Sequence, residues 1–355
     1  MKVPIRPTLG HTAALVSVPI TWGTFTPALK LLQEDSSPPA ALLNVGVHGV
    51  GAVALLGLFA FQTASRPTQD PLPMNEVTTI EPQSVDAQGD ANKRMRAVRA
   101  SVELGLLLFL GQILWIVGLE GISATESAVL VESAVVLVPL FVRRPPDVPV
   151  WKHWGPSVIA MLGISLLVGI GGEPAVAEPL LSGNPQIGDA SSSLAAATFD
   201  ASTAAEAPMA VAISFLAAAS FAGHTTRTGE YDDVGSTTQA LGQILVATIL
   251  DAVYLLASSL EATTTWLSSA TWPQLYELLL VAGWCGVVIC GFATWAQSYA
   301  QKVYSNTQAA LAYALEPVFA AAFAAFVVDE HLGSLQAAGG ALVVLANLVA
   351  TNTEE

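Results

Sequence analysis

Glu316 and Pro317 stand side by side within a long apolar stretch of the chain. A proline inside a helix removes one backbone hydrogen bond and clashes with the carbonyl four residues earlier, so we expect a helix break there. The freed carbonyls and the Glu316 carboxylate could then bind a cationic or amine group, or take up a coupling proton. The alternative is a structural carboxylate that is hydrogen-bonded to a neighbouring helix.

Glu132 lies in an earlier apolar stretch that aligns without a gap with the stretch that contains Glu316. Ser123–Phe141 falls against Ser305–Phe323, with identical residues at five of nineteen positions. Glu132 then precedes the equivalent of Glu316 by two positions, which is about 200° around a regular helix. A regular helix therefore favours separate roles for the two carboxylates.

Two histidines could relay protons or gate a pathway, since histidine titrates near neutral pH. His48 lies in the middle of an apolar stretch between glycines, and His224 follows Gly223 near the end of another. A hydrogen-bonded histidine at the membrane interface is the alternative for His224. We expect Asp251 late in its helix, close to the outer surface, where solvent or a helix end would satisfy the carboxylate.

Four aromatic residues and one glutamine within the apolar stretches could line a solute cavity: Trp22, Trp115, Trp295, Tyr313 and Gln112. Tyr313 precedes Glu316 by three residues, and Gln112 precedes Trp115 by three, so each pair shares a helix face. Such rings could stack on a flat or cationic solute. Ordinary helix packing is the alternative. The sequence predicts no catalytic residue, metal ligand or cofactor.

The elements that position these side chains are expected to be transmembrane helices. The chain has 53% hydrophobic and 12% charged residues, against about 25% charged in a soluble protein. Ten apolar segments approach the roughly 20 residues that cross a bilayer. They lie at 10–32, 39–62, 101–121, 124–142, 154–172, 207–227, 236–259, 274–300, 304–328 and 332–351. The sequence therefore predicts an all-α membrane protein with ten transmembrane helices.

The basic residues predict the orientation, because Lys and Arg are retained on the cytoplasmic side. With the N-terminus in the cytosol, twelve of the 13 Lys and Arg residues fall in inner loops, and only Lys30 lies outside. The inner residues are Lys2, Arg6, Arg66, Lys93, Arg94, Arg96, Arg99, Arg143, Arg144, Lys152, Arg227 and Lys302. Both termini are therefore expected in the cytosol, and a plasma membrane, an endomembrane and a plastid envelope fit equally.

Two polar segments divide the chain. Residues 63–99 are rich in Pro, Gln and Asp and are expected to form a disordered cytosolic loop. Residues 173–206 form an acidic outer linker between a first repeat, 1–172, and a second repeat, 207–355. Five helices in each half would insert in opposite directions, and such inverted repeats are typical of secondary transporters.

Three segments resemble the EamA family of the drug/metabolite transporter superfamily. They are ITWGTFTPALKLL (Ile20–Leu32), GLEGISATESAVLVESAVVLVPLF (Gly118–Phe141) and AALAYALEPVFAAAFAAFVVDEHLGSLQAAGGALVVLAN (Ala309–Asn347). The resemblance implies a ten-helix exporter or exchanger of small solutes. The chain departs from the family where the second helix lacks an arginine and where Arg143-Arg144 replaces a common Gly-Glu, so the substrate does not carry over.

The sequence therefore predicts a secondary transporter of small organic solutes that works by alternating access. A non-transporting membrane scaffold or receptor with the same fold is the alternative. No Walker, HExxH, GxGD or Gly-x-Ser-Gly motif is present, so an enzyme is not expected. The expected partners are a small-molecule solute and the lipid bilayer, and no nucleic acid is expected. A homodimer is possible on the sequence alone.

Overall fold

The computed structural model describes residues 6–25, 28, 38–65, 87–119, 122, 124–144, 146, 148–168, 201–327 and 333–351. Lys30, residues 66–86 of the predicted cytosolic loop and residues 173–200 of the predicted linker lie outside these ranges.

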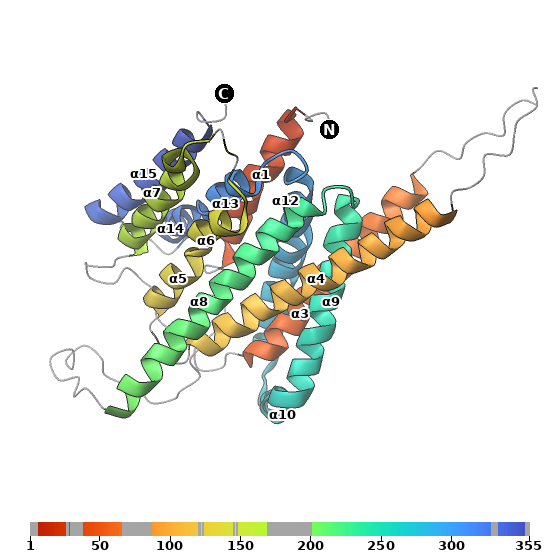
Figure 1. Ribbon diagram of the computed structural model, residues 1–355. Coiled ribbons are helices and arrows are strands. Elements are labelled where there is room, and N and C mark those ends of the chain that lie inside the picture. Colours follow the sequence, from red (N-terminus) through yellow and green to blue (C-terminus); the bar gives the residue numbers. More distant parts are fainter. Residues whose placement is uncertain are drawn as a thin grey trace, which may run out of the picture.

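The regular elements in the described residues are all helical, as the sequence predicts (Figure 1). The first half contains α1 (Leu9–Trp22), α3 (Ala40–Ala64), α4 (Ala87–Leu119), α5 (Ala124–Glu132), α6 (Ala134–Phe141) and α7 (Val150–Val168). The second half contains α8 (Ala201–Glu230), α9 (Ser236–Tyr254), η2 (Leu255–Ser259), α10 (Leu260–Ser269), α11 (Trp272–Trp284), η3 (Cys285–Ala293), α12 (Thr294–Ala300), α13 (Asn306–Tyr313), α14 (Glu316–Val327) and α15 (Ser334–Thr351). The segments η2 and η3 are π-helical.

Five of the described helices are long and apolar enough to cross a membrane. They are Ala40–Ala64, Gly89–Gly118, Pro208–Glu230, Ser236–Ser269 and Trp272–Ala300. Two shorter apolar helices, Ser127–Phe141 and Ser334–Ala350, lie in other predicted segments. Each of the ten apolar segments predicted from the sequence overlaps helical residues.

Two predicted polar segments are shorter than expected. Residues 87–99 belong to α4 rather than to a disordered loop, and residues 201–206 begin α8 rather than ending the linker. Lys and Arg favour helices, and Arg96 is held in place by an ion pair to Asp233 at 2.6 Å. The prediction of disorder over 87–99 was therefore wrong. It relied on amino-acid composition, which does not reveal the contact between Arg96 and Asp233 at this end of α4.

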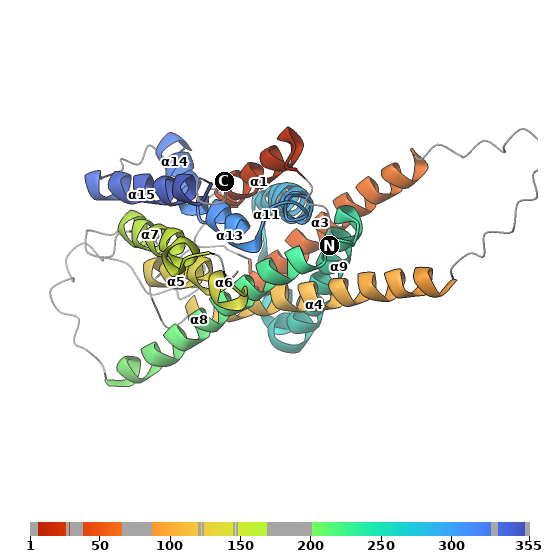
Figure 2. The same ribbon diagram turned by 45° about the horizontal axis from the view of Figure 1, so that its top comes forward.

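α4 and α8 run alongside each other in both views (Figures 1 and 2). Between the middle of α4 and the end of α8, the Arg227 guanidinium and the Tyr231 hydroxyl both donate hydrogen bonds to the Glu103 carboxylate. Burial and the hydrogen bond to Glu103 raise the pKa of Tyr231. The Lys302 ammonium donates to the backbone carbonyls of Asp232 and Val234 at 2.8 and 2.6 Å. These contacts join α4, the α8–α9 turn and the α12–α13 turn.

α7 and α15 pack closely against each other, and Figure 1 shows them side by side. A Cβ atom on Gly163 would lie 2.7 Å from the Gly339 carbonyl oxygen, and one on Gly339 would lie 2.4 Å from the Leu167 nitrogen. Only glycine permits this approach of the two backbones, as in other small-residue interfaces of membrane helices.

Candidate functional site

The predicted break beside Pro317 is present. α13 ends at Tyr313, and α14 begins at Glu316, so a turn of two residues interrupts the helix. Pro317 has no N–H to donate to the Tyr313 carbonyl, which lies four residues earlier. Helical bonding resumes when the Val318 and Phe319 N–H groups donate to the Leu315 carbonyl at 3.0 and 3.1 Å. The Glu316 carboxylate therefore stands at the first residue of a helix that starts inside an apolar segment.

A second break lies at Ser133, between α5 and α6. The Ser133 N–H is shared by the carbonyls of Val129 and Leu130, and its hydroxyl donates to the Leu130 carbonyl at 2.5 Å. Such side-chain bonding to the preceding turn bends helices. In the ungapped alignment of the two halves, Ser133 corresponds to Leu315. The two breaks thus fall at the same aligned position.

Glu132 and Glu316 flank these two breaks and interact electrostatically with each other. Both side chains are half-buried. A regular helix would place them about 200° apart in phase, but both helices are interrupted at this level. The structure therefore brings together two carboxylates for which the sequence favoured separate roles.

Aromatic rings from α1 and α4 contact α13 and α5, the helices that end at the two breaks. The Trp22 ring packs on the Tyr313 ring, with centroids 5.2 Å apart, and the Phe25 ring lies 6.5 Å from Trp115. The Trp115 indole N–H donates to the Ser127 hydroxyl of α5 at 3.1 Å. Trp22 thus contacts Tyr313, the last residue of α13, and Trp115 contacts α5, so both rings have protein groups as partners.

Gly23 explains why the end of α1 reaches α14. A Cβ atom at this position would lie 2.8 Å from both the Ala320 nitrogen and the Phe319 Cβ atom. Because glycine has no side chain, the chain after Trp22 passes directly over the first turns of α14. This contact keeps the ring of Trp22 over Tyr313.

His48 and Asp251 form a buried pair between α3 and α9. The His48 Nδ1 atom lies 2.6 Å from an Asp251 carboxylate oxygen, and both side chains are less than 5% exposed. The expectation that Asp251 lies near the outer surface was wrong. The helix that begins at Ser236 continues through η2 to Ser269 instead of ending near residue 259, so Asp251 stands near its middle.

His224 and Trp295 lie in other surroundings. The His224 Nε2 atom lies 2.5 Å from the Gln243 side-chain oxygen, which joins α8 to α9. Trp295 stacks on Tyr299 with centroids 5.4 Å apart, and Tyr299 stacks on His11 at 4.4 Å. Neither contact includes the paired carboxylates.

Several buried polar atoms have no hydrogen-bond partner within the described part of the chain. Among them are the His48 Nε2 atom, the Gln112 oxygen, the Gln243 nitrogen, the Gln297 nitrogen and the Tyr313 hydroxyl. Buried polar groups normally find partners, so these atoms can bond to a solute or to water. Gln112 and Tyr313 were predicted from sequence, whereas Gln243 and Gln297 were missed, although both are glutamines within apolar segments.

Sequence reasoning also missed the roles of Asp251, Phe25 and Ser127. Asp251 is a carboxylate within an apolar segment, which usually indicates a functional residue. The predicted helix ended too early, near residue 259, so Asp251 was expected close to the helix end. No pattern pointed to Phe25 or Ser127. No group of three or more His, Cys, Asp or Glu side chains that could hold a metal ion occurs in the ranges that the structure describes.

Comparisons with known proteins find a family similarity in the second part of the chain. A sequence profile described as the EamA-like transporter family matches residues 208–352. No curated protein matches the chain in sequence. Among solved structures 23 chains match. One, titled only "Crystal structure of protein", has a TM-score of 0.66 and 14% identity, with 96% of each chain covered. At this identity the likeness shows the fold alone.

The profile and the apolar helices lead to the same class of protein. A chain with five helices able to cross a bilayer and a transporter-family match over its second half is a multi-pass integral membrane protein. The resemblance predicted from the sequence is confirmed over residues 208–352, which match the model of the EamA-like transporter family.

Proposed function

We propose that this protein is a secondary transporter of small organic solutes that works by alternating access around the paired helix breaks. The observation that carries the proposal is the position of Glu132 and Glu316. Each stands at a helix interruption, the interruptions are equivalent in the two halves, and the two carboxylates interact. Interrupted helices near the middle of the membrane form the solute and ion sites of many secondary transporters.

The electrostatics of the breaks favour a solute with an amine or another cationic group. The carbonyl ends of α5 and α13 point into the breaks, and a helix C-terminus carries about half a negative charge. The two carboxylates add to this negative potential. The amino ends of α6 and α14 begin at the same level and could accept an anionic group of the same solute.

We infer ten membrane crossings in two inverted repeats of five, with both termini in the cytosol. The breaks at equivalent positions support the repeat, as does the close packing of α7 with α15, the last helices of the two halves. The contacts of Arg96, Arg227 and Lys302 support the orientation, because they gather three predicted inner residues at one end of the bundle. The start of α1 and the end of α15 also lie toward one side (Figure 1).

The direction of transport is proposed to be export or exchange, driven by protons or by a counter-solute. His48 and Asp251 form a second buried titratable pair that a coupling proton could occupy. The pair lies between α3 and α9, on elements other than those of the carboxylate breaks. Solute binding and proton binding could therefore use separate sites.

The test is flux in sealed proteoliposomes preloaded with amino acids, amines, nucleobases or sugar phosphates, with and without a pH gradient. We expect flux of an amine-bearing pool, reduced at least tenfold by Glu132→Gln and by Glu316→Gln. The matched control is Glu261→Gln, which removes an exposed carboxylate of α10. Each variant is checked for insertion and thermal unfolding before flux is compared.

Saturable solute binding without flux in any pool would contradict transport and favour the membrane receptor or scaffold. Normal flux in both carboxylate variants would remove the paired breaks from the pathway. Flux that is insensitive to the pH gradient and requires solute on both sides would identify exchange and exclude a coupling proton.

A further inference from the structure

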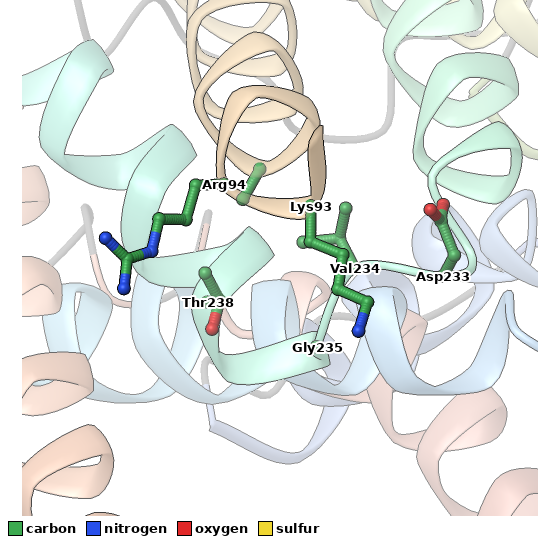
Figure 3. Close-up of a pocket in the computed structure, with 7 residues that line it drawn as sticks. Lys93, Arg94, Asp233, Val234, Gly235 and Thr238 are labelled. Carbon is green, nitrogen blue, oxygen red and sulfur yellow. The ribbon is translucent and has the colours of Figure 1, made fainter. Parts of the chain in front are cut away.

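A pocket of about 250 Å³ lies where the first turns of α4 meet the α8–α9 turn. Its lining includes Lys93 and Arg94 of α4, Asp233 and Gly235 of the turn, and Thr238 of α9 (Figure 3). In this view the Thr238 side chain lies between those of Arg94 and Lys93. None of the residues that line the pocket is one of the paired carboxylates or another candidate transport residue.

The charge in the pocket is positive, although a carboxylate lines it. Asp233 is neutralised by Arg96, whose Nε atom lies 2.6–2.7 Å from the carboxylate oxygens. Lys93 has only a weak, exposed pairing with Asp90 at 3.7 Å. Arg94 has no hydrogen-bond or ion-pair partner among the residues that the structure describes. Two cationic side chains are therefore available to an anion.

The start of α9 adds backbone donors to the same pocket. α9 begins after Gly235 without a side-chain cap, so its first N–H groups are not covered by a capping residue. Free N–H groups and the helix dipole favour phosphate-like anions at this end. The Thr238 hydroxyl can donate to the same oxygen atoms, and phosphate is therefore the chemistry that fits the pocket.

Two exposed apolar stripes run from the pocket along the membrane-spanning parts of α4 and α9. On α4, Val98 and Val102 follow Arg94 at intervals of four residues, and both side chains are exposed. On α9, Leu245 and Ile249 follow Thr238 at intervals of seven and four, and both are exposed as well. These intervals keep each stripe on one helix face. Because α4 packs against α9, the stripes flank a common seam.

We propose that this seam binds an anionic phospholipid, with its phosphate headgroup in the pocket and its acyl chains along α4 and α9. A soluble phosphate would use the cations and the start of α9 but would gain nothing from the apolar stripes. A neutral phospholipid would use the stripes without the full charge complementarity. Only an anionic lipid satisfies both parts, and the site does not depend on the proposed transport.

The experiment measures thermal unfolding of the purified full chain in detergent during titration with dioctanoyl phosphatidylglycerol. We expect a saturable rise in the unfolding temperature. The variant Lys93→Gln/Arg94→Gln should weaken the apparent affinity about thirtyfold, from about 1 kcal/mol per basic residue near an anionic lipid at tenfold per 1.4 kcal/mol. The matched control, Arg6→Gln/Arg143→Gln, removes two exposed basic residues from the same predicted membrane side and should keep the wild-type affinity.

Two further sets of titrations distinguish an anionic lipid from a free phosphate and from a neutral lipid. Glycerol phosphate and inorganic phosphate carry the charge without acyl chains, and dioctanoyl phosphatidylcholine carries the chains with a neutral headgroup. A saturable rise with inorganic phosphate at the same concentrations would overturn the lipid in favour of a free anion. An equal response to phosphatidylcholine, an equal loss in the control variant or the absence of any response in the wild type would each overturn the proposal.

Discussion

At the scale of single residues, the buried pair of His48 and Asp251 is the least expected feature. Charged groups within a membrane protein are costly and usually mark function. The pair lies between α3 and α9, and the Cys290 side chain of η3 interacts with His48. Its π-helical neighbour η3 fits this picture, since π-helical turns are frequent at functional sites.

Removing one member of the pair should be more harmful than removing both. We expect Asp251→Ala and His48→Ala each to destabilise the protein by about 3–5 kcal/mol, because each leaves an uncompensated polar partner. The double variant should lose clearly less than the sum of the two. A double-mutant cycle of unfolding free energies in detergent measures this coupling, and additive losses would contradict a coupled pair.

At the scale of elements, the interruption between α13 and α14 is attributed to Pro317. The variant Pro317→Ala restores the missing N–H, and a continuous helix should then move Glu316 away from Glu132. We expect an unfolding temperature equal to or above that of the wild type, together with at least a tenfold loss of flux. The control Pro208→Ala replaces an exposed proline within α8. Wild-type flux in Pro317→Ala would show that the break is not required.

The contact between α7 and α15 gives a second prediction at this scale. Gly339→Ala places a methyl group against the backbone of α7, and overpacking of this kind costs about 1–3 kcal/mol. Gly49→Ala is the control, because a Cβ atom there meets no atom within 4 Å. It should stabilise α3 by about 0.5–1 kcal/mol. If Gly339→Ala and Gly49→Ala change the free energy of unfolding in the same direction, the close approach of α7 and α15 is contradicted.

At the scale of the whole molecule, the inferred ten crossings make a direct prediction about topology. Both native cysteines are buried, so an impermeant maleimide should leave the unmodified chain unlabelled. Arg143→Cys and Ser305→Cys should react from the same side of a sealed vesicle, and Ser268→Cys from the opposite side. An odd number of crossings between residues 143 and 305 would place the first two reporters on opposite sides and contradict the inverted repeat.

The sequence by itself determined the helical membrane class, the approximate positions of the apolar segments, the resemblance to the EamA family and the break beside Pro317. These properties are local, because they depend on the hydropathy of about 20 consecutive residues or on the covalent structure of proline. Glu316 and Tyr313 could be placed on one helix face from their spacing of three residues. The sequence could not place the end of the helix after Asp251, because threonines and serines near residue 259 resemble a loop.

Only the tertiary structure decided which of these side chains meet. Glu132 interacts with Glu316 where both helices are interrupted, although a regular helix would give the two aligned positions different phases. His48 contacts Asp251, which lies 203 positions later in the chain. Arg96, near the start of α4, forms an ion pair with Asp233. Such contacts depend on the packing of helices that are distant in sequence, and periodicity within one helix carries no information about its partner.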